Sequence, residues 1–255
     1  MKKISLILVV ILLFSISAGC DTTERGTSMS QLEKNTVKAE HQLPESQYVS
    51  FPTPQTSGVR ILFVGNSITR HAPKPDIGWT HDWGMAASAL DKDYVHQTMQ
   101  RVADSGTDAC ACIAQVSAWE GHYADGRSRL PLYDTARAFR PDIIVWRAIE
   151  NCPAADFDPD AFTDNLRALI DYLNADGHAR VIWTTSFWHH PGDDAVRALA
   201  QLRGEPLVEL GDLGEQDAMK AIGLFAHSGV AAHPGDAGMQ EIAARIFAAM
   251  APMLR

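Results

Sequence analysis

The chain has 255 residues, of which 46% are hydrophobic, so it is long enough to bury one sizeable core. Its formal net charge is −9 and no basic cluster follows the first residues, which argues against a surface that binds nucleic-acid phosphates. We therefore expect a globular domain whose partner is not a nucleic acid.

The first twenty residues have the pattern of an export signal. Two lysines precede an apolar run, residues 4–16, that is too short to span a bilayer comfortably. Small residues then lead to Cys20, as at a bacterial lipid-attachment site, although Ser17 stands where an aliphatic residue is usual. We expect residues 1–19 to be a signal peptide and Cys20 to carry a lipid, with simple secretion as the alternative. The protein would then lie in the cell envelope and touch the membrane only through this lipid anchor, and otherwise be periplasmic or secreted.

The remainder of the chain divides into a polar segment and a domain. Residues 20–58 are polar and lack apolar periodicity, so we expect a flexible tether. Residues 59–255 form one domain by size. This domain contains Cys110, Cys112 and Cys152, an odd number without the spacing of a zinc site. We expect them to be buried apolar residues, with a disulfide of Cys152 as the less favoured alternative.

Strands and helices alternate along this domain. The strands are expected from short apolar runs and the helices from apolar residues at helical spacing. The expected strands are one from residue 59 that ends at Gly65, then 108–116, 143–146, 180–185 and 206–209. The expected helices are 84–102, 130–139, 157–175, 194–202, 215–222 and 236–253. The alternation predicts a three-layer α/β/α sandwich of about five parallel strands, joined by right-handed crossovers in a flavodoxin-like wind.

The first strand ends abruptly in Gly65-Asn66-Ser67. Gly65 permits a sharp turn that leaves the Ser67 hydroxyl at the carboxyl end of the strand, where open α/β sheets bind ligands. Ser67 is equally suited to cap a following helix, so the motif alone leaves both interpretations open. A nucleophilic serine also needs a base, donors for an oxyanion and a group that orients the base.

Two polar residues are expected at the same edge of the sheet. His233 stands in Ala231-Ala-His-Pro-Gly-Asp-Ala-Gly238, just before the last helix, and could serve as a base. Asn151 ends the third strand, and its amide can donate toward an oxyanion. Each has an ordinary alternative, because loop histidines often have no special role and an asparagine after a strand is usually a turn residue.

In order and spacing, these residues resemble the SGNH (GDSL-type) hydrolases. Gly65-Asn66-Ser67-Ile68 is similar to the first block of that superfamily, whose serine is the nucleophile. Asn151 matches the third-block asparagine that donates to the oxyanion, and His233 matches the histidine base of the last block. The resemblance implies the SGNH fold and a carboxylic ester hydrolase. It also implies that no metal or organic cofactor is needed and that the substrate is a small-molecule or polysaccharide ester.

The last block departs from the superfamily pattern. Val230 occupies the position, three residues before the histidine, where an aspartate usually stands. We expect a backbone carbonyl near Gly229 or Val230 to orient His233 instead, with a carboxylate such as Glu150 as the alternative.

The second and third blocks depart as well. Ile149 replaces the usual glycine two residues before the asparagine, and the second block has no clear match. The backbone N–H of Ser67 and the Asn151 side chain supply two oxyanion donors. We expect the third to be the N–H of Ser117, with Gly121 as the alternative.

The substrate wall is expected from aromatic and polar residues near the same edge. Candidates for substrate binding are Trp79, Trp83, Trp119, Glu150 and Trp188. Aromatic faces suit sugar rings, but each tryptophan is as well explained by core packing, and Glu150 by a pair with Arg147. His189 and His190 are weak evidence for a metal, and His227 either supports the site or lies on the surface.

With the export signal, the tryptophans favour a carbohydrate ester, for example an O-acetyl group on a polysaccharide. Two alternatives stay open: an O-acyltransferase that uses the same residues, and a glycan-binding protein without catalysis.

Overall fold

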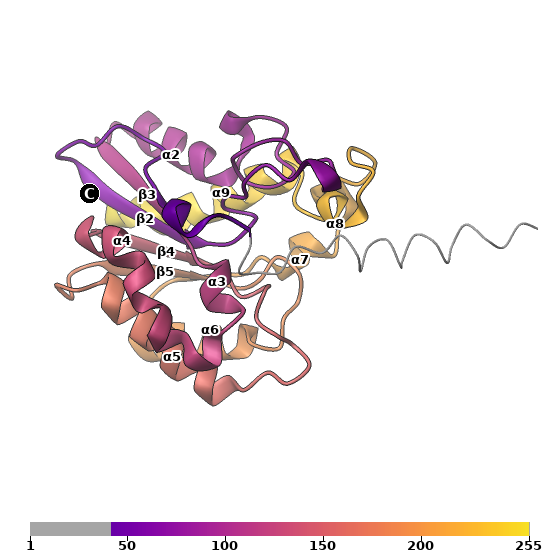
Figure 1. The fold of residues 1–255 in the computed structure, drawn as a ribbon. Helices are drawn as coiled ribbons and strands as arrows, with labels where there is room; N and C mark the ends of the chain where they lie inside the picture. Colours follow the sequence, from indigo (N-terminus) through magenta and orange to yellow (C-terminus); the bar gives the residue numbers. More distant parts are fainter. Residues whose placement is uncertain (1–41, 255) are drawn as a thin grey trace, which may run out of the picture. The chain divides into compact units, whose positions relative to one another are not determined.

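The structure, a computed structural model, describes residues 42–254 (Figure 1). The expected signal peptide, Cys20 and the first part of the expected tether lie outside the described residues. Within the described part, no helix combines the length and the apolar character needed to cross a membrane.

A six-stranded sheet forms the middle layer of residues 42–254 (Figure 1). In sequence order the strands are β1 (Val49–Ser50), β2 (Val59–Gly65), β3 (Ala109–Gln115), β4 (Ile143–Arg147), β5 (Arg180–Thr184) and β6 (Leu207–Val208). Their order in the sheet is β1-β3-β2-β4-β5-β6, and every pair is parallel except β1 with β3. If the parallel strands β2 to β6 are renumbered 1 to 5, their order in the sheet is 2-1-3-4-5, as in flavodoxin-like folds. The strand order reverses between β2 and β4, which is the switch point of the sheet. Ligands of such sheets bind at that point.

Helices cover both faces of the sheet (Figure 1). The longer helices are α2 (Tyr94–Asp104), α4 (Asp134–Ala138), α5 (Pro159–Leu173), α6 (Asp193–Arg203) and α9 (Asp236–Met250). Because side chains alternate along a strand, Ile61 and Phe63 of β2 pack with α2 and α9, whereas Leu62 and Val64 pack with α5 and α6. The predicted three-layer sandwich is therefore confirmed.

Short helices connect these elements. They are α3 (Ser117–Glu120), α7 (Gly211–Gly214), α8 (Ser228–Ala231), η2 (Glu45–Gln47), η3 (Pro75–Ile77), η4 (Leu90–Lys92), η5 (Tyr123–Tyr133), η6 (Asp217–Met219) and η7 (Ala251–Met253), where η marks a 3₁₀ helix. The expected helix 84–102 begins only at Tyr94, because the Asp93 carboxylate caps it by accepting from the His96 N–H at 2.8 Å. The expected helix 130–139 is divided between the end of η5 and α4, and within the expected helix 215–222 only η6 is helical.

The expected tether is wrong for residues 42–58. β1 adds a strand to the sheet edge beside β3, and Leu43 and Tyr48 are buried in the same core as α4 and α5. These apolar residues are too few and too irregularly spaced to produce a readable period. The cysteine prediction is confirmed, since Cys110, Cys112 and Cys152 are free and buried.

Candidate active site

Ser67 lies in a tight turn directly after β2, at the switch point of the sheet. The turn is closed by the N–H groups of Thr69 and Arg70, which both donate to the Asn66 carbonyl at 2.9 Å. Gly65 is required by close approach, because a Cβ there would lie 1.7 Å from the Thr69 Oγ1. No α-helix begins at Ser67, so the alternative in which this serine caps a helix does not hold.

The structure brings Ser67 and His233 together although they are far apart in the sequence. Ser67 Oγ lies 3.0 Å from His233 Nε2, and His233 Nδ1 lies 2.7 Å from the Gly229 carbonyl oxygen. Because a carbonyl can only accept, Nδ1 carries the ring proton and Nε2 offers its lone pair to the serine hydroxyl. The expected backbone carbonyl acceptor is therefore present.

His233 is held by backbone contacts between α8 and α9. Its N–H donates to the Val230 carbonyl at 3.0 Å, and its carbonyl accepts from the Ala221 N–H at 2.9 Å. The Trp188 ring stands edge-on to the imidazole, with ring centroids 5.0 Å apart. The pKa of His233 is lowered to about 4, mainly by burial and with a smaller contribution from nearby His71, although the Gly229 carbonyl opposes the shift. The imidazole is thus neutral at neutral pH.

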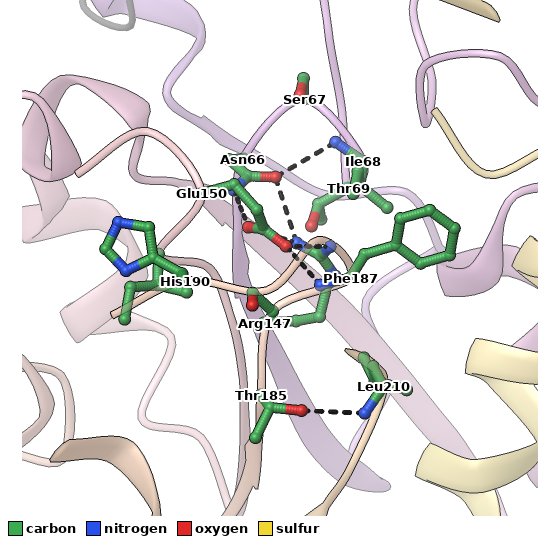
Figure 2. Close-up of polar contacts among 12 residues, drawn as sticks. Asn66, Ser67, Ile68, Thr69, Arg147, Glu150, Thr185, Phe187, His190 and Leu210 are labelled. Carbon is green, nitrogen blue, oxygen red and sulfur yellow. Dashed lines mark hydrogen bonds and ion pairs between the residues drawn. The ribbon is translucent and has the colours of Figure 1, made fainter. Parts of the chain in front are cut away.

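A buried ion pair lies beneath the turn (Figure 2). The Arg147 guanidinium donates to both oxygens of Glu150, at 3.0 and 2.6 Å. Glu150 also accepts from Asn66 Nδ2 at 2.6 Å and from the Phe187 N–H at 2.9 Å. Burial acts to raise the pKa of Glu150, but Arg147 and these donors together hold it below its usual range. Glu150 is therefore engaged by Arg147 and does not orient His233.

A second buried carboxylate, Glu120, was not expected from the sequence. It accepts from the Ile149 N–H at 2.5 Å, from Asn151 Nδ2 at 2.7 Å and from Asn66 Nδ2 at 3.0 Å. Burial and the neighbouring Glu150 carboxylate raise the pKa of Glu120 to about 7, while these donors oppose the rise. The residue at the end of α3 thus ties together three segments of the site.

Ile149 keeps a backbone conformation that suits the glycine it replaces. Its φ is 131°, a region in which a β-branched residue is strained. The side chain is fully buried, and the short hydrogen bond to Glu120 holds the peptide in place. The strain therefore persists because packing and a carboxylate fix both sides of the residue.

The Asn151 carboxamide is held from both ends. Its Nδ2 donates to Glu120, and its Oδ1 accepts from Gln42 Nε2 at 3.1 Å. Nδ2 carries two hydrogens, and within residues 42–254 Glu120 uses one of them. The other remains for a ligand. The Ser67 N–H makes no hydrogen bond within the described part of the chain.

The structure does not bring the expected third oxyanion donor to the site. The Ser117 N–H donates to Gln115 Oε1 at 3.1 Å, and the residue is fully buried. The alternative, Gly121, donates its N–H to the Ser117 carbonyl at 3.0 Å within the turn of α3. Neither N–H is free for an oxyanion, because the Gln115 side chain occupies the first and the turn of α3 occupies the second.

A cavity of about 180 Å³ opens beside Ser67. It is lined by Gln42, Ser67, His71, Ile77, Met85, Glu150, Asn151, Trp188, His227, Gly229, Val230 and His233. Trp188 and Glu150 were expected there, whereas Gln42 was not. A glutamine in a polar segment carries no sequence signal that separates a cavity wall from ordinary surface.

Three of the four tryptophan candidates do not line this cavity. Trp79 and Trp119 are fully buried in apolar clusters. Trp83 donates its indole N–H to the Ala87 carbonyl at 2.9 Å and borders a different hollow. These residues follow the alternative of core packing, because bulky aromatics also close the loops over the sheet.

His189 and His190 were weak candidates for metal ligands. Across 42–254, no group of three or more His, Cys, Asp or Glu side chains is arranged to hold a metal ion. His190 is buried, with its ring nitrogens 3.0 Å from the Cys152 carbonyl and 3.0 Å from the Gly192 N–H. His189 points into solvent. The histidine pair therefore offers no site.

The architecture is that of known esterases. The chain is similar to the psychrotrophic esterase EstA from Pseudoalteromonas sp., solved in a form inhibited by monoethylphosphonate, at 13% identity and a TM-score of 0.53 over 76% of this chain and 98% of that one. It is similar to a carbohydrate esterase family 3 protein from Talaromyces cellulolyticus at 14% identity and a TM-score of 0.50, over 77% and 98% of the two chains.

A third structure of the same kind is a two-domain esterase (CEX) active on acetylated mannans, at 16% identity and a TM-score of 0.50, over 76% of this chain and 48% of that one. No protein-family model and no curated protein sequence matches the chain. The structural likenesses show that this chain has the SGNH hydrolase fold.

Proposed function

We propose that the protein is a serine esterase in which Ser67 is the nucleophile and His233 the base. The observation that carries the proposal is the contact of 3.0 Å between Ser67 Oγ and His233 Nε2, with the opposite ring nitrogen committed to the Gly229 carbonyl. A free serine is a weak nucleophile, and a neutral imidazole at this distance is the group that activates it.

The chemistry runs through an acyl-enzyme. As Ser67 Oγ attacks the ester carbonyl carbon, His233 Nε2 takes the hydroxyl proton. The Ser67 N–H and the free hydrogen of Asn151 Nδ2 donate to the oxyanion. The imidazolium then gives its proton to the departing alcohol oxygen. In the second half, His233 takes a proton from water as the water oxygen attacks the acyl carbon. The bond from this carbon to Ser67 Oγ then breaks, the imidazolium returns its proton to Oγ, and the acid is released.

The cavity favours a short acyl group on a polar alcohol. A volume of about 180 Å³ is small for a long fatty acyl chain, and the lining includes the polar side chains of Gln42, His71 and His227. His227 Nδ1 accepts from the Val230 N–H, so its Nε2 carries the proton in the neutral ring. This Nε2 is buried and has no partner among the described residues. It is a donor suited to a substrate hydroxyl.

We propose O-acyl, in particular O-acetyl, carbohydrate as the substrate. The expected export signal and lipid attachment at Cys20 support this choice, because they would expose the domain to envelope or external polysaccharide. The similar two-domain esterase is described as active on acetylated mannans, which is a related chemistry. Trp188, beside His233, supplies an aromatic face for a sugar ring.

The test is a panel of p-nitrophenyl esters of increasing acyl length together with acetylated glycans. We expect the acetyl esters to be hydrolysed best and Ser67→Ala to lose at least roughly a thousandfold in kcat while remaining folded by circular dichroism. Ser128→Ala, the same exchange on the surface, is the matched control. Undiminished turnover by Ser67→Ala would contradict the proposal. Added acceptor sugar, with product analysis, separates hydrolysis from acyl transfer.

A further inference from the structure

Four hydrogen bonds beside the cavity run in one direction. The Ser117 N–H donates to Gln115 Oε1 at 3.1 Å, and Gln115 Nε2 donates to Gln42 Oε1 at 2.7 Å. Gln42 Nε2 donates to Asn151 Oδ1 at 3.1 Å, and Asn151 Nδ2 donates to Glu120 Oε2 at 2.7 Å. We call the three consecutive side chains Gln115, Gln42 and Asn151 the amide relay.

The chemistry at the two ends fixes the direction of this relay. A backbone N–H can only donate, so Gln115 must present its oxygen to Ser117. At the other end, Glu120 already accepts from Ile149 and Asn66, and its carboxylate oxygens accept from Asn151 as well. Each amide in between has one donor side and one acceptor side. With both ends fixed, every carboxamide of the relay has a single satisfied orientation.

Gln42 is anchored and is not a loose end of the chain. The segment that carries it runs over the sheet edge, where the Gln115 N–H donates to the Tyr48 carbonyl at 2.8 Å. Arg70 Nη1 donates to the Gln47 carbonyl at 3.0 Å, and β1 pairs with β3 just beyond. Gln42 itself is buried and lines the cavity. The segment thus delivers one amide to the site from outside the five parallel strands.

We propose that Gln42 and Gln115 are positioning residues that fix the Asn151 carboxamide with its donor available to the oxyanion. The inference rests on the proposed function, because it takes Asn151 as an oxyanion donor. An asparagine turned by 180° would set Oδ1 against the Glu120 carboxylate and Nδ2 against Gln42 Nε2, which are two repulsive contacts. The relay excludes that orientation, and it makes residues 42–50 part of the active site.

The first test changes the polarity of one amide. Gln42→Glu keeps the acceptor for Gln115 but removes the donor to Asn151. No hydrogen bond then holds Asn151 Oδ1 toward residue 42. We expect kcat to fall by roughly 10- to 100-fold with KM little changed, short of the loss on removing an oxyanion donor outright. Labelling of Ser67 by a fluorophosphonate, whose phosphoryl oxygen takes the oxyanion position, should slow by a similar factor. Gln42→Met should behave alike, and Gln97→Glu, the same exchange on the surface, should leave both rates unchanged.

The second test separates orientation from stability. Glu120→Gln should lower both the melting temperature and kcat. The glutamine oxygen is needed to accept from Ile149 and Asn66, which leaves the NH2 group facing Asn151 Nδ2, and an NH2 group cannot accept a hydrogen bond. In the double variant Gln42→Glu with Glu120→Gln, a turned Asn151 is satisfied on both sides. We expect the melting temperature to recover toward the wild-type value while kcat and the labelling rate stay low. A merely structural role would restore activity together with stability.

Two results would overturn the relay. One is a Gln42→Glu variant with wild-type kcat and wild-type labelling of Ser67. The other is a double variant whose kcat recovers in step with its melting temperature. In either case the esterase proposal stands as long as Ser67→Ala is inactive. Turnover retained by Ser67→Ala removes the proposed function itself, so the two failures are distinguishable.

Discussion

The two sides of the cavity differ in the polar groups that they contain, which are carboxylates on one side and histidines on the other. The wall built from the strand ends contains Glu150 and is backed by the buried Glu120, and each of these carboxylates accepts several hydrogen bonds. The wall built from loops contains His71, His227 and His233, whose rings form hydrogen bonds with backbone groups and with Ser67. Charge is therefore concentrated on the side of Asn151 and kept from direct contact with the base.

This contrast has a chemical consequence. A carboxylate beside the imidazole would stabilise the imidazolium that forms as Ser67 attacks, whereas the Gly229 carbonyl offers a dipole. The base stays neutral to low pH but gains less stabilisation when it takes the proton. In the proposed mechanism, the strand-end side offsets this by holding Asn151, the proposed oxyanion donor, in one orientation. We thus expect the base to be essential and the precision of the site to come from Glu120 and its neighbours.

The largest expected effect compares one residue from each wall. His233→Ala should lose roughly 10⁴-fold in kcat, because nothing else near Ser67 Oγ can take its proton. Asn151→Ala should lose roughly 10²- to 10³-fold, as expected for one oxyanion donor. Steady-state kinetics on p-nitrophenyl acetate give both values, and circular dichroism shows whether the variants are folded. The reverse ranking would mean that the strand-end wall supplies the proton acceptor.

The next effect is on stability. Arg147→Met leaves the Glu150 carboxylate buried without its cation, which should reduce the free energy of unfolding by about 3–5 kcal/mol. The matched control is Arg197→Met, which removes an ion pair with Glu209 at the surface and should cost at most about 1 kcal/mol. Urea unfolding followed by fluorescence measures both. Equal losses would show that the strand-end wall gains nothing from burying its charges.

The sequence predicts the parallel strands of this fold better than its edge strand. The parallel strands were predicted closely, because β2 to β5 are continuous apolar runs that end at a turn or a polar residue. Short motifs and the rule that strand ends share one edge singled out Ser67, Asn151 and His233, and all three line the same cavity. β1 was missed because a strand of two residues has no period to detect.

The reason why the amide relay was missed is different. Gln42, Gln115 and Asn151 are ordinary polar residues in sequence, separated by 73 and 109 positions for the two pairs that touch Gln42. Their role arises from hydrogen-bond direction, which exists only once the fold has brought them together. The tryptophans failed similarly, since an aromatic such as Trp119 looks the same in sequence whether it fills the core or lines a cavity.

The pH dependence of kcat/KM should show the titration of Glu120 and of His233 as separate steps. The pKa of Glu120 is raised to about 7, so as the pH falls through 7 it gains a proton and accepts less well from Asn151. The pKa of His233 is lowered to about 4, so the base is lost only at more acidic pH. We expect kcat/KM to fall in two steps on the acid side, the first partial and the second complete.

Glu120→Gln identifies the upper step, since this variant has no carboxyl group to titrate there. Its kcat/KM should be low but flat between about pH 8 and pH 6, whereas the wild-type value falls over that range. Glu150, whose carboxylate faces Glu120, stays ionised throughout because Arg147 holds its pKa low. An upper step that persists in Glu120→Gln would assign it to another group.

The smallest expected effect comes from placing a carboxylate near His233 in the loop wall, where the chain has Val230. Val230→Asp places a negative charge in the wall that holds His233, which favours the imidazolium and should raise the pKa of this base by about one unit. The lower step of the pH profile should then move to higher pH by that amount. Val230→Asn has the same shape without the charge, so it should leave the step in place. Because Val230 packs with Ile77 and Met85, both exchanges should lower the free energy of unfolding by about 1–3 kcal/mol. A step that moves equally in both variants would arise from altered packing, and the absence of a carboxylate would not explain the low pKa of His233.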